Sequence, residues 1–192
     1  MGKHPITRRA VFLDRDGVLN RPMIRDLRPY PPMRLDDLTL YEDARESCAR
    51  LKGAGFRLIV ATNQPDVGRG TVSRATVEAM HEVLRRDLPS IDSIEVCYHA
   101  GARYGEPCAC RKPSPGMLLR AAAEFNLDLH ASYLVGDRWR DVDCARAAGC
   151  RAIFIDRGYE EQLRAAPDFV AQTLTEAVDF VLREIVVEST CR

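Results

Sequence analysis

The chain has 192 residues, and its 28 lysines and arginines are balanced by 28 aspartates and glutamates. The zero net charge argues against nucleic-acid binding through bulk positive charge, and the 46% hydrophobic content argues against a disordered chain. The apolar runs are far shorter than the roughly 20 residues of a membrane-spanning helix. We expect a cytoplasmic, monomeric protein that binds neither nucleic acid nor membranes, with one domain over residues 1–192 and a peripheral tail at 184–192.

Short apolar runs alternate with longer helical patterns along the chain. The runs that we expect to form strands are residues 10–13, 56–62, 94–98, 133–135 and 152–155. The patterns that we expect to form helices are residues 42–52, 73–87, 115–125, 141–148 and 176–183. The alternation predicts an α/β fold: a three-layer α/β/α Rossmann-like sandwich with a central parallel sheet. Residues 21–37 and 98–115 show neither pattern, and we expect both segments to be irregular.

Polar side chains follow three of the predicted strands directly. Asp14 and Asp16 follow the first strand, and Asp137 and Asp141 follow the fourth. The second strand leads into a hydroxyl and two amides, those of Thr62, Asn63 and Gln64. Ligands of open parallel sheets bind at the carboxyl ends of the strands. We therefore expect these side chains to share one site.

The composition of this predicted site indicates its chemistry. Carboxylates this close cannot all stay ionised unless a cation lies among them, and an all-oxygen ligand set suits Mg²⁺. Arg111 and Lys112, just before a predicted helix, would add positive charge, and Arg138 would line the mouth. A carboxylate nucleophile can form an acyl phosphate, so the set favours phosphoryl transfer. Each piece also has a structural alternative: Asp-x-Asp-Gly is common in turns, and Asp141 could simply stabilise a helix N-terminus.

Four motifs together resemble the haloacid dehalogenase superfamily of phosphatases. They are Asp14-Arg15-Asp16-Gly17, Ala61-Thr62-Asn63-Gln64, Arg111-Lys112-Pro113, and Gly136-Asp137 with Asp141. Within that superfamily, the stretch from Cys110 to Met117 is similar to the heptose 1,7-bisphosphate 7-phosphatase family. The similarity runs from about Val11 to Asp156, which is most of the chain.

The resemblance implies roles for the strand-end carboxylates. Asp14 would be the nucleophile. Asp16 would protonate the leaving sugar oxygen and then activate the water that hydrolyses the aspartyl-phosphate. Mg²⁺ would be held by Asp14, Asp137 and the backbone carbonyl of Asp16, with Asp141 in a supporting position.

The resemblance also implies which groups meet the substrate. Thr62 and Lys112 would steady the phosphoryl oxygens, and Arg111 would help to recognise the substrate. From their positions at the mouth, we expect three more side chains to bind substrate: Asn63, Gln64 and Arg138.

Seven cysteines are many for a chain of this size in a reducing compartment. Cys97-x-His99 and Cys108-x-Cys110 bracket a short loop, and three thiols with one imidazole match a tetrahedral Zn²⁺ site. Four protein ligands leave no open position, so we expect a structural zinc in a loop over residues 97–110, as in the family that the chain resembles. The alternative is three free thiols beside an exposed histidine. Cys48, Cys144 and Cys150 are expected to be small core residues.

Together these features predict a Mg²⁺-dependent phosphomonoesterase with little or no cap domain. The resemblance implies hydrolysis of the 7-phosphate of D-glycero-D-manno-heptose 1,7-bisphosphate, in nucleotide-activated heptose biosynthesis. One alternative is a phosphatase for histidinol phosphate or another small sugar phosphate. A non-enzyme alternative is a receiver-like phosphoacceptor module. Asp16 distinguishes a phosphatase from a phosphoacceptor module, because a pure acceptor has no need of a second acid for turnover.

Overall fold

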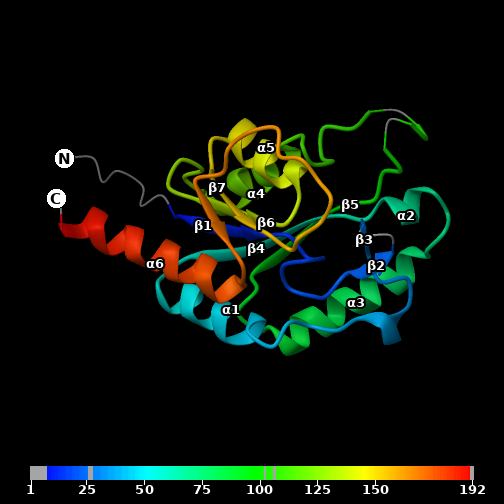
Figure 1. Ribbon diagram of the computed structural model, residues 1–192, viewed down its shortest axis with the longest axis horizontal. Coiled ribbons are helices and arrows are strands. Elements are labelled where there is room, and N and C mark those ends of the chain that lie inside the picture. The colour runs from blue at the N-terminus through cyan, green and yellow to red at the C-terminus, as the bar shows by residue number, and fades with distance from the viewer. Residues whose placement is uncertain (1–7, 26–27, 102, 106, 191–192) are drawn as a thin grey trace.

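The computed structural model describes residues 8–25, 28–101, 103–105 and 107–190, and one parallel sheet lies at its centre (Figure 1). The strands of this sheet are β1 (Ala10–Leu13), β4 (Arg57–Asn63), β5 (Ser93–Cys97), β6 (Tyr133–Gly136), β7 (Arg151–Ile155) and β8 (Phe169–Ala171). Their order is β5-β4-β1-β6-β7-β8, and every pairing is parallel. The five predicted strands are therefore confirmed, and β1 lies inside the sheet between β4 and β6.

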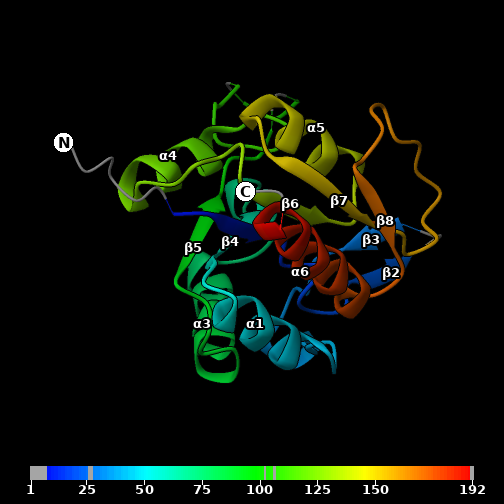
Figure 2. The ribbon, with the colours of Figure 1, turned by 90° about the vertical axis from the view of Figure 1, so that its left-hand side faces the viewer.

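Helices cover both faces of the sheet, which confirms the three-layer sandwich. They are α1 (Ala44–Gly53), α2 (Pro65–Gly68), α3 (Arg74–Asp87), α4 (Gly116–Phe125), α5 (Trp139–Ala148) and α6 (Leu174–Thr190). Figure 2 shows α4 and α5 on one side of the sheet and α1 and α3 on the other. No helix of the described residues is long and apolar enough to cross a bilayer.

The alternation of side chains along β1 explains why both faces are covered. All four β1 residues are buried. Val11 and Leu13 belong to a core cluster with residues of α1 and α6, whereas Ala10 and Phe12 belong to a second cluster with residues of α4 and α5. Successive strand residues point to opposite faces, so a strand with no polar position requires a helix layer on each side.

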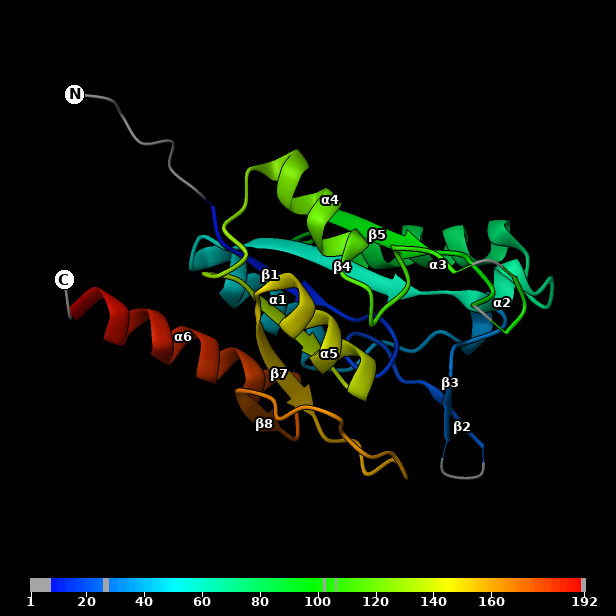
Figure 3. The ribbon, with the colours of Figure 1, turned by 90° about the horizontal axis from the view of Figure 1, so that it is seen from above.

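We predicted an irregular segment at residues 21–37, and this prediction is wrong. It contains an antiparallel hairpin, β2 (Met23–Arg25) with β3 (Arg28–Tyr30), and a short 3-10 helix, Leu35–Asp37. Most hairpin residues are exposed, so this segment has no apolar alternation to reveal it. Figure 3 shows the hairpin projecting beyond the end of the sheet to which the β4 arrow points.

The carboxyl-terminal part also contains more regular structure than expected. The three-residue edge strand β8 was not predicted, and its shortness leaves little pattern to detect. Helix α6 runs to Thr190, so most of the expected tail at 184–192 is helical. Residues 191–192 lie outside the described part of the chain.

Candidate active site

Two glycines allow the carboxylates of neighbouring strands to meet. Gly17 has φ +88°, and a Cβ there would lie 1.8 Å from Asp137 Oδ2. A Cβ on Gly136 would lie 2.2 Å from the Cβ of Asp141. Only glycine leaves the space at these two positions free, and the positive φ of Gly17 also favours glycine there. The two strand ends therefore bring their acidic side chains together as the sequence predicts.

Three carboxylates and one ammonium group form what we call the carboxylate floor: Asp14, Asp137, Asp141 and Lys112. The carboxylates lie at the ends of β1 and β6 and in the first turn of α5, and one oxygen from each lies within 4.8 Å of the others. The Lys112 Nζ lies 3.0 Å from Asp14 Oδ2 and 2.6 Å from Asp141 Oδ1. All four side chains are buried.

Burial makes the negative charge of the floor costly. It raises the pKa of Asp14 to about 6, although the Lys112 ammonium opposes this shift. Burial and the neighbouring carboxylates likewise raise the pKa of Asp137 well above its usual range. Burial lowers the pKa of Lys112, but Asp14 and Asp141 outweigh that effect and raise it overall.

The floor fits a divalent cation. Asp137 Oδ1 is buried and makes no hydrogen bond within the described part of the chain. An unsatisfied buried carboxylate oxygen, in a set made only of oxygen donors, suits Mg²⁺. The side chain of Asp16 is not in this cluster, and its expected contribution to the metal is its backbone carbonyl.

Asp16 lies beside the floor with its carboxylate held by other side chains. The Arg15 guanidinium donates to both of its oxygens at 3.0 Å. Asn20 Nδ2 donates to Oδ1 at 3.0 Å, and Gln64 Nε2 donates to Oδ2 at 2.8 Å. Asp16 also lines the pocket described below, so its carboxylate is both fixed and within reach of a ligand.

The three polar residues from the end of β4 differ in position. Asn63 lines the pocket and exchanges two 3.0 Å hydrogen bonds with the Lys112 backbone. Thr62 and Gln64 are buried, and Gln64 Nε2 donates to Thr62 Oγ1 at 2.9 Å. Gln64 thus supports its neighbours Asp16 and Thr62, and its side chain is not part of the pocket wall that we expected it to join.

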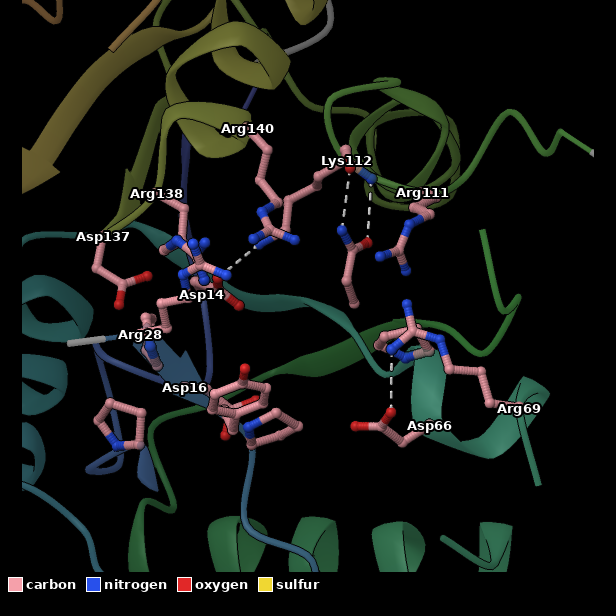
Figure 4. Close-up of a pocket in the computed structure, with 16 residues that line it drawn as sticks. Asp14, Asp16, Arg28, Asp66, Arg69, Arg111, Lys112, Asp137, Arg138 and Arg140 are labelled. Atoms are coloured by element: carbon pink, nitrogen blue, oxygen red, sulfur yellow. Dashed lines mark hydrogen bonds and ion pairs between the residues drawn. The ribbon is translucent and has the colours of Figure 1, made fainter. Parts of the chain in front are cut away.

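A pocket of about 250 Å³ opens above the floor, and five arginines line it (Figure 4). They are Arg28, Arg69, Arg111, Arg138 and Arg140. Arg69 pairs with Asp66 at 3.2 Å, and Arg138 pairs with Glu161. We leave out Arg138 and call the other four arginines the arginine rim: Arg28, Arg69, Arg111 and Arg140.

The members of the rim come from separate parts of the fold, and three of them influence one another through their charges. Arg28 lies on β3, Arg69 follows α2, Arg111 precedes α4 and Arg140 lies in α5. Burial, and after it the charges of Arg140 and Arg69, lower the pKa of Arg111. The Nε atom of Arg140 is buried without a hydrogen bond to a described residue. Mutual repulsion of this kind is relieved when an anion binds.

The sequence reading missed Arg28, Arg69 and Arg140. Arg140 lies between Asp137 and Asp141, so its place in the motif could have revealed it. Arg28 could not be found, because the hairpin that carries it had no recognisable pattern. Trp139, which lies between the two motif aspartates in the sequence, has the Arg164 guanidinium carbon 3.5 Å from its ring centroid and does not line this pocket.

A sulfur-rich cluster, the thiol cluster, forms beside the rim from Cys97, His99, Cys108 and Cys110. The Sγ–Sγ distances lie between 3.3 and 3.7 Å, and His99 Nδ1 lies 3.2 Å from Cys110 Sγ. A tetrahedral Zn²⁺ with bonds of about 2.3 Å would separate its sulfur ligands by about 3.8 Å. These four side chains can therefore hold one metal ion, while Cys48, Cys144 and Cys150 are buried free thiols as expected.

The thiol cluster connects directly to both parts of the pocket. Cys110 is followed by Arg111 of the rim and Lys112 of the floor. An Nη atom of Arg111 donates to the His99 carbonyl at 3.4 Å. Anchoring this loop therefore holds a cation of each region in place.

Comparisons with known proteins agree with this geometry. A HAD-hydrolase-like family model matches residues 109–177. The chain is 34% identical to the D-glycero-D-manno-heptose-1,7-bisphosphate 7-phosphatase of Thermosynechococcus vestitus, over 91% of this chain and 95% of the relative. It is 34% identical to the D-glycero-beta-D-manno-heptose-1,7-bisphosphate 7-phosphatase of Escherichia coli K12, over 72% of this chain and 74% of that protein.

Comparison with solved structures also finds heptose bisphosphate phosphatases. The D,D-heptose 1,7-bisphosphate phosphatase of B. bronchiseptica, complexed with magnesium and phosphate, superposes with a TM-score of 0.74 at 31% identity, covering 92% of this chain and 99% of that one. The D,D-heptose 1,7-bisphosphate phosphatase of Burkholderia thailandensis superposes with a TM-score of 0.61 at 26% identity, covering 93% of this chain and 99% of that one.

Proposed function

The chain belongs to the D-glycero-D-manno-heptose-1,7-bisphosphate 7-phosphatase family of HAD-like hydrolases, and we propose that its pocket binds a heptose 1,7-bisphosphate and releases the 7-phosphate. It is a phosphatase of that superfamily. The similarity to the Thermosynechococcus vestitus relative covers 91% of this chain and 95% of that protein.

Asp14 is the proposed nucleophile, and its carboxylate attacks the phosphorus atom to form an aspartyl-phosphate. Bound Mg²⁺, held by Asp14, Asp137 and the Asp16 backbone carbonyl, would supply charge neutralisation for the phosphoryl group. Lys112 holds Asp14 at 3.0 Å and adds a second positive charge. For the buried Thr62 hydroxyl, which accepts from Gln64, we propose a contact with a phosphoryl oxygen of the bound substrate.

Asp16 is the proposed acid and base. It gives a proton to the departing sugar oxygen, and its carboxylate then takes a proton from the water that attacks the aspartyl-phosphate. The three side chains that grip Asp16 support this role, because proton transfer depends on orientation. This second, positioned acid also disfavours the receiver-like alternative, which has no use for it.

The choice of a bisphosphate substrate rests on the arginine rim. Within the described residues, no ion pair joins Arg28, Arg111 or Arg140 to a carboxylate. A substrate whose second phosphate lies outside the floor would place its charge among these guanidinium groups. Histidinol phosphate has no second phosphate and carries an ammonium group, which the rim would repel. The rim therefore favours the bisphosphate over that alternative.

For the thiol cluster we propose one structural Zn²⁺. Three thiolates and one imidazole are a common ligand set for this ion, and with four protein ligands no position is left for substrate. Burial, and after it the contact with Cys110, raise the pKa of the Cys97 thiol to about 12, so a cation is needed to keep the cluster ionised. We also propose that the protein is a monomer.

The test is phosphate release from a substrate panel in the presence of Mg²⁺. The panel contains the heptose 1,7-bisphosphate, the heptose 7-phosphate, a hexose bisphosphate and histidinol phosphate. The highest kcat/KM is expected for the heptose bisphosphate, with the 1-phosphate retained in the product. A higher value for histidinol phosphate or for the monophosphate would contradict the proposal.

A further inference from the structure

Arg15 stands between the two aspartates that follow β1, and its side chain is completely buried. A buried guanidinium is costly unless its donors find acceptors. Its Nε lies 3.2 Å from Asp16 Oδ1, and its Nη2 lies 3.0 Å from each oxygen of the same carboxylate. The planar fork of Arg15 therefore fixes the plane of the Asp16 carboxylate.

The remaining nitrogen of Arg15 turns toward α3. Its Nη1 lies 3.4 Å from His81 Nε2 and 3.9 Å from Met80 Sδ. His81 is completely buried. Burial, and after it the charge of Arg15, lower the pKa of His81 to about 4, so the imidazole is neutral near pH 7. A neutral imidazole that carries its proton on Nδ1 offers Nε2 as an acceptor for Arg15.

Glu78 fixes this form of His81 from the other side. His81 Nδ1 lies 3.3 Å from Glu78 Oε2, and the Tyr98 hydroxyl donates to Glu78 Oε1 at 2.6 Å. Tyr98 therefore binds one oxygen of the Glu78 carboxylate, and the other oxygen faces the imidazole of His81. A continuous set of contacts thus runs from the end of β5 through α3 to the carboxylate of Asp16.

We infer that His81 is a positioning residue for the phosphatase reaction: by accepting from Arg15 it aligns the fork that holds Asp16 for proton transfer. The inference rests on the proposed function, since it requires Asp16 to be the acid and base. His81 contacts neither the pocket nor Asp16, so its effect passes through Arg15. Small displacements of a proton-transfer group cost large factors in rate, and about 1 Å can cost about 100-fold.

Two substitutions at the same position separate alignment from packing. In His81→Gln the side-chain amide oxygen can replace Nε2 as the acceptor, whereas His81→Leu fills the space without one. Val77→Ala is the matched control, because Val77 is buried on the same helix and its apolar side chain offers Arg15 no hydrogen-bond acceptor. All three proteins are compared with the wild type by thermal unfolding and by kinetics with Mg²⁺ present.

The kinetic readout compares two leaving groups. Departure of a sugar oxygen needs a proton, whereas p-nitrophenolate leaves without one. His81→Leu is expected to lower kcat/KM for the heptose bisphosphate about 10-fold and kcat/KM for p-nitrophenyl phosphate less than about 2-fold, with KM for the bisphosphate unchanged. His81→Gln should stay within about 3-fold of the wild type for both esters. Val77→Ala should lower Tm and leave the ratio of the two esters as it is.

An equal loss for both esters, or an equal loss in His81→Leu and His81→Gln, overturns the inference. If His81→Leu shows no cooperative unfolding, Glu78→Met takes its place. The Glu78 side chain is 41% exposed, so the change is tolerated, and an unchanged ester ratio then refutes the positioning role. Should the wild type fail on the heptose bisphosphate, the proposed substrate is wrong. The ester ratio is then measured with the alkyl phosphate that the panel shows to be best.

Discussion

The carboxylate floor and the arginine rim carry opposite charge and are built in opposite ways. The floor is buried, and its carboxylates come from the ends of β1 and β6 and the first turn of α5, all fixed by the sheet. The rim comes from a hairpin, two loops and one helix turn, and it faces the pocket opening. We propose that the floor performs phosphoryl transfer on any ester that reaches it, and that the rim decides which ester does.

This division predicts that changes in the floor abolish turnover, whereas changes in the rim alter substrate affinity. The thiol cluster stands between them, because its loop supplies Arg111 to the rim and Lys112 to the floor. Substitutions in each part can therefore show whether the two regions are as separate as the geometry indicates.

The largest effect is expected for Asp14→Asn. The amide cannot form the aspartyl-phosphate, so kcat for phosphate release should fall by roughly 1,000-fold or more. The fold should remain, because an amide has nearly the same shape and removes a buried charge. Asp36→Asn, a change at an exposed aspartate, is the control. Substantial activity in Asp14→Asn would break the assignment of the floor as the chemical centre.

The next effect is expected for Cys110→Ser. Loss of one of the four ligands should reduce bound zinc from about one per chain to near zero and lower Tm by about 5–10 °C. Elemental analysis and thermal unfolding measure the two quantities. Cys48→Ala, which removes a buried thiol that belongs to a different core cluster from Cys97, should keep the zinc. A wild-type protein purified under reducing conditions without zinc would rule out the proposed metal.

A moderate effect of pH on the free energy of unfolding is expected from His81. His81 binds a proton below pH 4 when folded but near its ordinary pKa of 6.5 when unfolded, so the unfolded chain binds more protons between these values. Stability is therefore lost as the pH falls from 6.5 to 4, by roughly 2 kcal/mol at pH 5. Urea unfolding at pH 7 and pH 5 should show this loss in the wild type and not in His81→Gln. Equal pH dependence in both proteins would contradict a neutral buried His81.

The smallest effect is expected for Arg28→Met in the rim. Removing one guanidinium should raise KM for the heptose bisphosphate about 10-fold and leave kcat within about 2-fold. Arg25 pairs with Arg28 in the hairpin register but does not line the pocket, so Arg25→Met is the matched control. A fall in kcat without a change in KM would mean that the rim also shapes the floor.

The same division explains what could be predicted from the sequence. Asp14, Asp137 and Lys112 could be placed because each directly follows a buried apolar strand or precedes a helix, and the sheet fixes where such ends meet. Arg28 could not, because its hairpin is exposed and its strands are three residues long. The burial of Gln64 was also unpredictable, since its amide serves Asp16 and Thr62, and only the folded chain brings these together.

The arrangement around Lys112 has a consequence for how the floor exchanges protons with water. With all three carboxylates ionised, the ammonium leaves a net charge of minus two, equal and opposite to one Mg²⁺. Because the pKa of Asp14 is raised to about 6 and that of Asp137 is also raised well above its usual range, the floor without a cation holds protons near neutral pH. Metal uptake must release them, so the apparent affinity for Mg²⁺ should rise with pH, and buffers of different ionisation enthalpy should give different calorimetric heats.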